Sequence, residues 1–227
     1  MEFQFPGFKP EARQFLRELA ANNNRAWFKP RKAEYEKYVR GPLMELTWEL
    51  GVALSDFAEG YRTDPRKAVY RIYRDVRFSR NKDPYKTHAA AIFPPIGLDR
   101  HAGAGFYFHF SADEMFVGGG VYAPGSAELR LIRERIASDH EDLRGIVAAP
   151  DFKQAFGDIR GVTLKRIPQG FPRDHPAADL LVRKQFLAAA TLPAADIEKP
   201  SIAGALDRHF RAIAPFLAFL NQPLRPS

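Results

Sequence analysis

Phenylalanine occupies every second position between residues 106 and 110, and few folds accept such a pattern. Phe106, Phe108 and Phe110 alternate there with Tyr107 and His109. Successive side chains of a β-strand point to opposite faces, whereas a helix repeats every 3.6 residues. This segment therefore predicts a strand with one wholly apolar face, which another part of the chain must cover.

The same alternation, read from Ala68 to Tyr122, predicts a meander of about four strands. We place them near 68–78, 87–94, 104–111 and 114–122, with turns at 79–84, 95–97 and 112–113. Residues 68–78 also fit a helical stripe, but their Val, Ile, Tyr and Phe content favours a strand. On that strand Arg74 would point to the apolar side and would need a buried acceptor.

Helices are predicted on both sides of this segment. Apolar residues at helical spacing follow Pro10 and run again from Pro42 to about Phe57, and Asn24 can cap a short helix over 25–28. Further helices are predicted over 126–137, 140–147 and 201–217, with one from Asp174 to about Lys184. Short strands are predicted over 162–166 and 185–191.

These elements together predict an α+β fold, in which N-terminal and C-terminal helices pack on a central, mostly antiparallel sheet. The 227 residues can bury about 70% of their unfolded surface. Trp27, Phe28 and Trp48 are assigned to the core. Gly118-Gly119-Gly120 indicates a bulge or a tight crossing of strands, because the Lys-Ser/Thr of a phosphate loop does not follow. Without repeats or long linkers, residues 1–227 are expected to form one domain.

Composition excludes several kinds of chemistry. The chain has no cysteine, which rules out disulfides, thiol nucleophiles and cysteine-bound metals. No pair of histidines has metal-ligand spacing, so neither a metal nor another cofactor is expected. The first residues do not resemble a signal peptide, and no apolar run approaches the ~20 residues that cross a bilayer. We therefore expect a cytoplasmic protein that does not enter a membrane.

Positive charge is concentrated in two runs. Residues 62–86 contain nine Lys or Arg against three Asp, a surplus of six, where the whole chain has a net charge of +7. Residues 160–186 contain six Lys or Arg against two Asp. A basic protein favours anionic partners. The position of this charge tells us where to look for a ligand.

We predict that both runs wall one pocket for a phosphorylated or other anionic small molecule. Arginine offers a rigid donor fork for phosphate or carboxylate, and lysine offers a point charge. Tyr85 would pack against an organic part of the ligand. The other predicted binding residues are Arg71, Arg74, Arg77, Lys82, Lys86, His88, Lys165, Arg166, His175 and Lys184. In the alternative interpretation, the arginines pair with nearby aspartates in a structural network.

Two other functions compete with ligand binding. One is a metal-independent enzyme, in which Asp75 or His175 acts as general base and the cations stabilise negative charge. At a helix start His175 would tend to stay neutral, although the same residues also fit a simple helix cap. His88 and His109 could face one cavity with Asp75. The other function is nucleic-acid binding, since cations and rings alternate here, but no standard motif is present.

Four separated segments of the chain resemble a single family, the bacterial and fungal group called domain of unknown function 2461. They are 22–28, 71–86, 164–171 and 174–184. The similarity extends from about Phe5 to Leu220 and implies a single domain, without implying an activity. The chain has Asn81 where the family pattern has a second acid, which weakens a catalytic function for that position.

Overall fold

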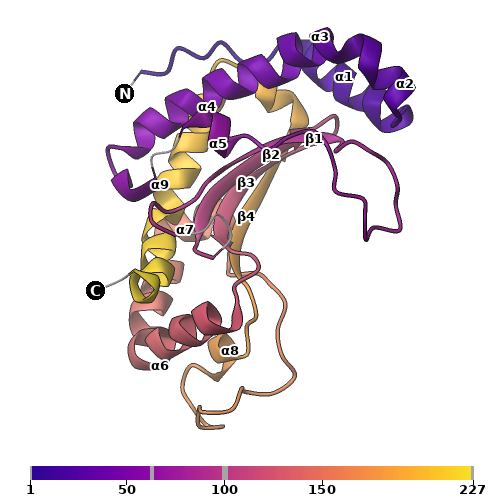
Figure 1. Ribbon diagram of the computed structural model, residues 1–227. Coiled ribbons are helices and arrows are strands. Elements are labelled where there is room, and N and C mark those ends of the chain that lie inside the picture. The colour runs from indigo at the N-terminus through magenta and orange to yellow at the C-terminus, as the bar shows by residue number, and fades with distance from the viewer. Residues whose placement is uncertain (1, 62–63, 99–101, 226–227) are drawn as a thin grey trace.

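The computed structural model describes residues 2–61, 64–98 and 102–225, so Arg62 at the start of the first basic run lies outside the described residues. The chain has the predicted α+β fold, with helices before and after a four-stranded antiparallel sheet (Figure 1). Buried apolar side chains from the helices and from all four strands form one continuous cluster.

The helical elements form two groups along the chain, and those from α2 to α4 follow one another without a gap. Those before the sheet are α1 (Pro10–Ala21), α2 (Arg25–Phe28), η1 (Lys29–Arg31), α3 (Lys32–Tyr35), the π-helix η2 (Glu36–Arg40), α4 (Gly41–Leu54), η3 (Glu59–Tyr61) and α5 (Pro65–Ala68). Those after the third strand are α6 (Ser126–Ala148), α7 (Pro150–Phe156), α8 (Ala178–Leu181), η4 (Ala194–Glu198), α9 (Ile202–Asn221) and η5 (Gln222–Leu224).

The strands are β1 (His88–Phe93), β2 (Gly105–Ser111), β3 (Glu114–Val121) and β4 (Phe186–Pro193). They lie in the order β1-β2-β3-β4, and each neighbouring pair is antiparallel. In the register Phe106 lies opposite both Phe93 and Gly119. The strands predicted over 87–94, 104–111, 114–122 and 185–191 are thereby confirmed.

The alternating phenylalanines of β2 form the centre of the core. Phe106, Phe108 and Phe110 are fully buried, and the Phe106 ring lies 4.9 Å from that of Phe210 on α9. A side chain at Gly119 would press against Leu217 of α9, so the missing Cβ lets this helix lie close to the sheet. The apolar face predicted from the alternation is therefore the face that α9 covers.

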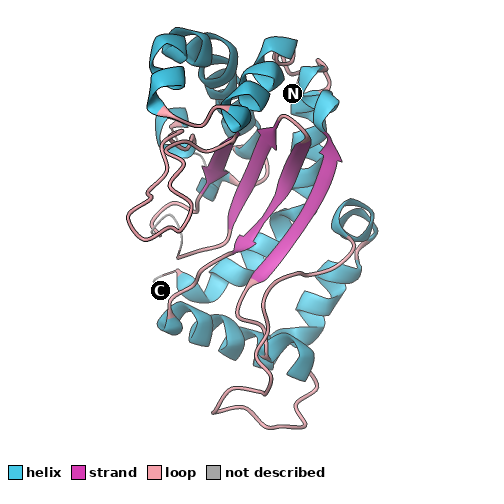
Figure 2. Ribbon diagram, turned by 90° about the vertical axis from the view of Figure 1, so that its right-hand side faces the viewer, coloured by secondary structure: helices cyan, strands magenta, loops and turns pink. Residues whose placement is uncertain are grey.

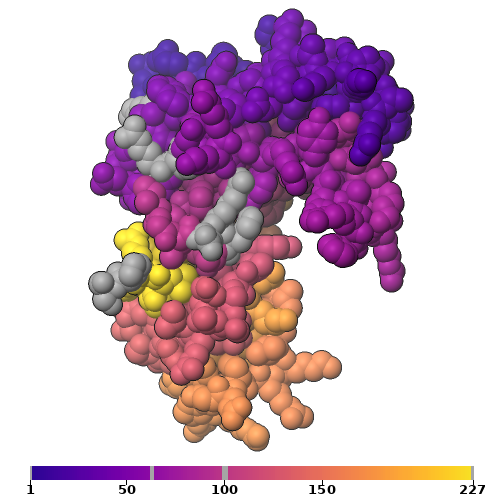
Figure 3. All heavy atoms as spheres, in the orientation of Figure 1, coloured from indigo at the N-terminus to yellow at the C-terminus, as the bar shows by residue number. Residues whose placement is uncertain are grey.

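The other face of the sheet is open. Figure 2 shows the four strands with the helices behind and around them, and none of the described helices crosses in front. Two loop regions flank this face, one before β1 and one between α7 and β4 (Figure 1). In the space-filling view the outline is indented between the two corresponding lobes (Figure 3).

The glycines of β3 let the backbone of β4 approach closely, although the register contains neither a bulge nor a crossing of strands there. A Cβ on Gly118 would collide with the carbonyl oxygen of Ala188, and one on Gly120 would collide with that of Phe186. Gly120 also has φ of +131°, which side-chain-bearing residues rarely adopt. These two positions of β3 thus add no side chain to the open face.

The strand predicted over 68–78 is wrong. Residues 65–68 form α5, and residues 69–86 make only isolated bridges, Val69 with Ala91 and Tyr73 with Tyr85. The segment folds back on itself: the Arg74 amide donates to the Pro84 carbonyl, and the Lys86 amide donates to the Ile72 carbonyl. Its composition favours an extended backbone, but a strand also needs a continuous neighbour, which residues 75–83 lack.

Three smaller predictions are also corrected. Residues 162–166 are exposed and form only the bridge between Thr163 and Arg183, so they are not a strand. The helix predicted from Asp174 shrinks to α8, whose N-cap residue Ala177 makes no side-chain cap. Trp48, assigned to the core, is 60% exposed. By contrast, the break predicted between 137 and 140 appears inside α6, where Asp139 has non-helical φ and ψ.

No helix among residues 2–61, 64–98 and 102–225 is both apolar and long enough to cross a membrane.

Candidate functional site

The basic run between α5 and β1 forms a projecting ribbon, residues 70–86, which we call the basic ribbon (Figure 1). Backbone hydrogen bonds hold residues 72–74 against residues 84–86. Asn23, from the turn before α2, fixes the outer arm: its side-chain amide donates to the Tyr85 carbonyl at 3.0 Å and its Oδ1 accepts from the Tyr85 amide at 3.1 Å. Two sequence segments 62 residues apart are thus joined.

A hollow of about 340 Å³ lies between this ribbon and α2, η1 and α3. We call it the cationic hollow. Four of the side chains around it are positively charged, and none is a carboxylate. The lining residues are Arg25, Phe28, Lys29, Lys32, Tyr73, Arg74, Val76, Pro84 and Tyr85.

Aromatic rings form the floor of the cationic hollow. The Phe28 and Tyr85 rings are stacked, with centroids 4.2 Å apart and planes at 25°, and the Tyr73 ring lies 5.4 Å from Tyr85. Burial, together with the neighbouring Tyr73, raises the pKa of Tyr85, so its hydroxyl stays neutral. Asn24 caps α2 through the Trp27 amide, as predicted, and so places Phe28 over the ribbon.

The cations of this hollow are largely without acidic partners. Among the described residues, no ion pair or side-chain hydrogen bond is formed by Arg25, Lys29 or Lys32. Arg25 and Lys29 are one helical turn apart, a spacing at which like charges repel. Arg74 is half-buried, and its guanidinium donates to the Asp83 carbonyl at 3.3 Å and to the Ser79 hydroxyl at 3.4 Å. It therefore has polar acceptors, although not on a strand.

The ribbon also borders a second hollow, of about 470 Å³, on the open face of the sheet. We call it the sheet groove. Lys86 and His88 lie at its β1 edge, and the Lys86 ammonium lies 4.7 Å from the centre of the Tyr70 ring. The other lining residues are Tyr70, Ala90, Ile92, Gly105, Tyr107, His109, Phe116, Gly119, Gly120, Tyr122, Leu187, Ala188 and Ala189.

Two histidines face each other in the sheet groove. The ring centroids of His88 and His109 are 5.0 Å apart. Burial lowers the pKa of His88 to about 4, and His109 and Lys86 add to the effect. Burial also lowers the pKa of His109, against the opposing influence of Glu114 at 3.4 Å. Both rings are therefore neutral at pH 7. Asp75, grouped with them in the sequence prediction, does not line this groove.

The remaining residues predicted in the first run are not in either hollow. Arg71 is exposed, and the Lys82 ammonium donates to the Val76 carbonyl at 3.0 Å. Arg77 pairs with Asp75 at 2.7 Å. This pairing lowers the pKa of Asp75 to about 2, so Asp75 is a weak proton acceptor.

The second basic run lies in the loop region at the far end of the open face (Figure 1). Lys165, Arg166 and Lys184 are exposed there, and neither hollow described above includes them. His175 accepts a hydrogen bond at Nδ1 from the Ala177 amide, so its neutral ring carries the proton on Nε2. The Nδ1 lone pair is thus already engaged by the backbone.

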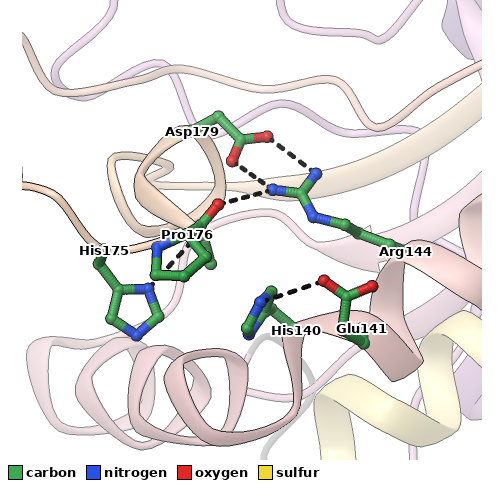
Figure 4. A network of polar contacts seen from close by, with 7 residues as sticks. His140, Glu141, Arg144, His175, Pro176 and Asp179 are labelled. Atoms are coloured by element: carbon green, nitrogen blue, oxygen red, sulfur yellow. Dashed lines mark hydrogen bonds and ion pairs between the residues drawn. The ribbon is translucent and has the colours of Figure 1, made fainter.

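Figure 4 shows the contacts around His175. Its ring lies 5.7 Å from that of His140 on α6, whose Nε2 is 3.2 Å from Glu141. Arg144, one turn further along α6, pairs with Asp179 at 2.8 Å and donates to the Pro176 carbonyl at 3.0 Å. This part of the second run is thus a structural link between α6 and α8. Within the described chain, no group of three or more His, Asp or Glu is placed to hold a metal ion.

Sequence reasoning missed the helical half of the cationic hollow. Arg25, Lys29 and Lys32 lie outside both basic runs, and their helical spacing was the available signal. Sequence reasoning also did not place Tyr107 or Phe116 in a groove. The position of α9 decides which face of the sheet stays open, and the sequence does not give that position.

The geometry defines a class of protein: an α+β fold with a cationic hollow beside an open antiparallel sheet. A family described as "Conserved hypothetical protein (DUF2461)" matches residues 11–219, nearly the whole chain. The chain belongs to this family, as the resemblance predicted. A comparison with curated proteins finds no match.

Proposed function

We propose that this protein binds a phosphorylated or other anionic small molecule in the cationic hollow. The observation that carries the proposal is the convergence of Arg25, Lys29, Lys32 and Arg74 on one hollow that no carboxylate lines. The mutual repulsion of these cations is relieved when an anion occupies the space between them.

The aromatic floor gives the ligand a second requirement. Tyr73 is 48% exposed and forms part of the wall, so it offers a ring face to an organic group. Tyr85 lies beneath it and is fixed by Asn23. An organic phosphate, with its charge toward the helix and its organic part over Tyr73, uses both features. The contribution of Lys165, Arg166, His175 and Lys184 stays a prediction.

The test is calorimetric titration with phenyl phosphate and with inorganic pyrophosphate. Arg25→Gln, Lys29→Gln and Arg74→Ala should each weaken binding by roughly 10-fold or more, because a hydrogen bond to a charged group contributes about 1.5–3 kcal/mol. Arg77→Gln is the matched control, since Arg77 belongs to the same ribbon but is paired with Asp75. Equal weakening in the control, or no binding of either probe, would contradict the proposal.

One observation favours a second candidate, single-stranded nucleic acid. Phe78, at the ribbon tip, is 95% exposed, and the Arg77 guanidinium lies 5.8 Å from its ring centre. Exposed rings beside cations are the elements that stack bases and hold phosphates. Oligo(dT) binding that weakens steeply between 50 and 200 mM salt and is lost in Phe78→Ala would support this function. The enzyme alternative gains no support, because neither Asp75 nor His175 is among the residues that line the hollow.

A further inference from the structure

The sheet groove has a floor that is almost free of side chains. Gly105 and Gly120 are partners in neighbouring strands, and Gly118, two residues before Gly120, pairs with Ala189. Ala90 lies further along the sheet, opposite His109. The Phe186 carbonyl oxygen of β4 excludes a Cβ at Gly120. A ligand in the groove can therefore approach the backbone of the sheet at these glycines.

Rings border this floor on its β1–β2–β3 side. His109 stacks on Phe116 with centroids 5.1 Å apart and planes at 12°, and His88 continues the row. Tyr107 stands between this row and Tyr70, at 6.1 Å from Phe116 and 6.3 Å from Tyr70. The volume of about 470 Å³ falls in the range of small-molecule sites.

Two polar groups in the groove have unused hydrogen-bonding capacity. Neither the Tyr107 hydroxyl nor the His88 imidazole hydrogen-bonds to another residue in the described part of the chain. Burial raises the pKa of Tyr107, so its hydroxyl stays a neutral donor. The charged groups at this end of the groove are Lys86 and Glu114, which have opposite signs.

We propose that the sheet groove is a second binding site, for a flat aromatic ring that carries one neutral hydrogen-bonding group. The ring lies on the glycine and alanine floor with its edge against Tyr107 and Phe116. Its polar group bonds to the Tyr107 hydroxyl. This site differs from the cationic hollow in what it selects: shape and hydrogen bonding rather than charge.

The test compares two uncharged alcohols of similar size, 2-naphthol and trans-2-decalol, of which only the first is flat. Binding is followed through the imidazole NMR signals of His88 and His109. 2-Naphthol should shift both signals and bind at least 10-fold more tightly than trans-2-decalol. Tyr107→Phe should weaken 2-naphthol by roughly 3- to 10-fold, as expected for one neutral hydrogen bond, while Tyr38→Phe leaves it unchanged.

A filling variant keeps the test independent of the tyrosine. Ala189→Leu should abolish the shifts, whereas Ala127→Leu, at an exposed position of α6, should not. Equal binding of both alcohols, or unmoved histidine signals up to the solubility limit, would overturn the proposal. So would a dimer, seen by light scattering, in which a second copy covers the groove. Because the probes are uncharged, failure here leaves phosphate binding at the cationic hollow untouched.

Discussion

Asn221, at the end of α9, should be among the most sensitive polar positions of the chain. Its side chain is fully buried and makes three hydrogen bonds. Its Oδ1 accepts from the Ala104 amide at 2.7 Å, and its Nδ2 donates to the Ala104 carbonyl at 2.8 Å and to the Tyr61 hydroxyl at 2.6 Å. These bonds fix the residue before β2, and hence the start of the strand that carries Tyr107.

Asn221→Ala leaves all three partner groups without a bond. A buried polar group that loses its partner costs about 1–3 kcal/mol. Three such groups give roughly 3 kcal/mol even at the lower value, out of a typical total of about 5–15 kcal/mol. We expect the free energy of unfolding to fall by about 3–6 kcal/mol.

Urea unfolding, followed by tryptophan fluorescence, measures this loss. Asn22→Ala is the matched control: Asn22 is exposed, and its side-chain amide donates only to the Glu18 carbonyl, so we expect a change below about 1 kcal/mol. If Asn221→Ala also lost less than about 1 kcal/mol with an unchanged dependence on urea, the inferred network would be refuted.

Three further outcomes are expected. Phe106→Ala should lower the free energy of unfolding by about 3–5 kcal/mol, and a loss below about 1.5 kcal/mol in urea would mean that this ring is not at the core centre. The pKa of His88 is about 4 in the folded chain and ordinarily about 6.5. As the pH drops from 6.5 to 4, the unfolded chain therefore binds this proton first, and the free energy of unfolding should fall. If His88→Phe kept the same pH dependence, another group would be responsible. Arg144→Ala should lower the free energy of unfolding by less than about 1 kcal/mol, because its ion pair is exposed. Amide hydrogen exchange in α8 should nevertheless become faster, and unchanged exchange would show that this contact does not order α8.

The sheet and most helices could be predicted because their signals are local. Alternation around Phe108 defines β2, and Asn24 marks the start of α2 where the structure has it. The segment at 68–78 could not be decided in this way. Its extended composition is real, but whether an extended segment joins a sheet depends on neighbours elsewhere in the chain, and residues 84–86 pair with it only briefly.

The candidate site was predictable only in part for the same reason. Arg74 and Tyr85 do line one hollow, and Lys86 and His88 line another. Charge density along the sequence indicated the ribbon but not its partner, because the contact with α2 depends on the turn at Asn23. The two basic runs lie in separate loop regions, a separation that no count of residues reveals.

The basic ribbon lines both hollows: Tyr73 and Arg74 line the cationic hollow, and Tyr70 and Lys86 line the sheet groove. A ligand that displaced the ribbon from one hollow would therefore change the space available in the other. Thermodynamic linkage makes such an influence mutual. If a ligand in the cationic hollow changes the affinity of the sheet groove for its ligand, the second ligand changes the affinity of the cationic hollow by the same factor. Two unlike molecules could thus report on one another through a strip of backbone that touches both.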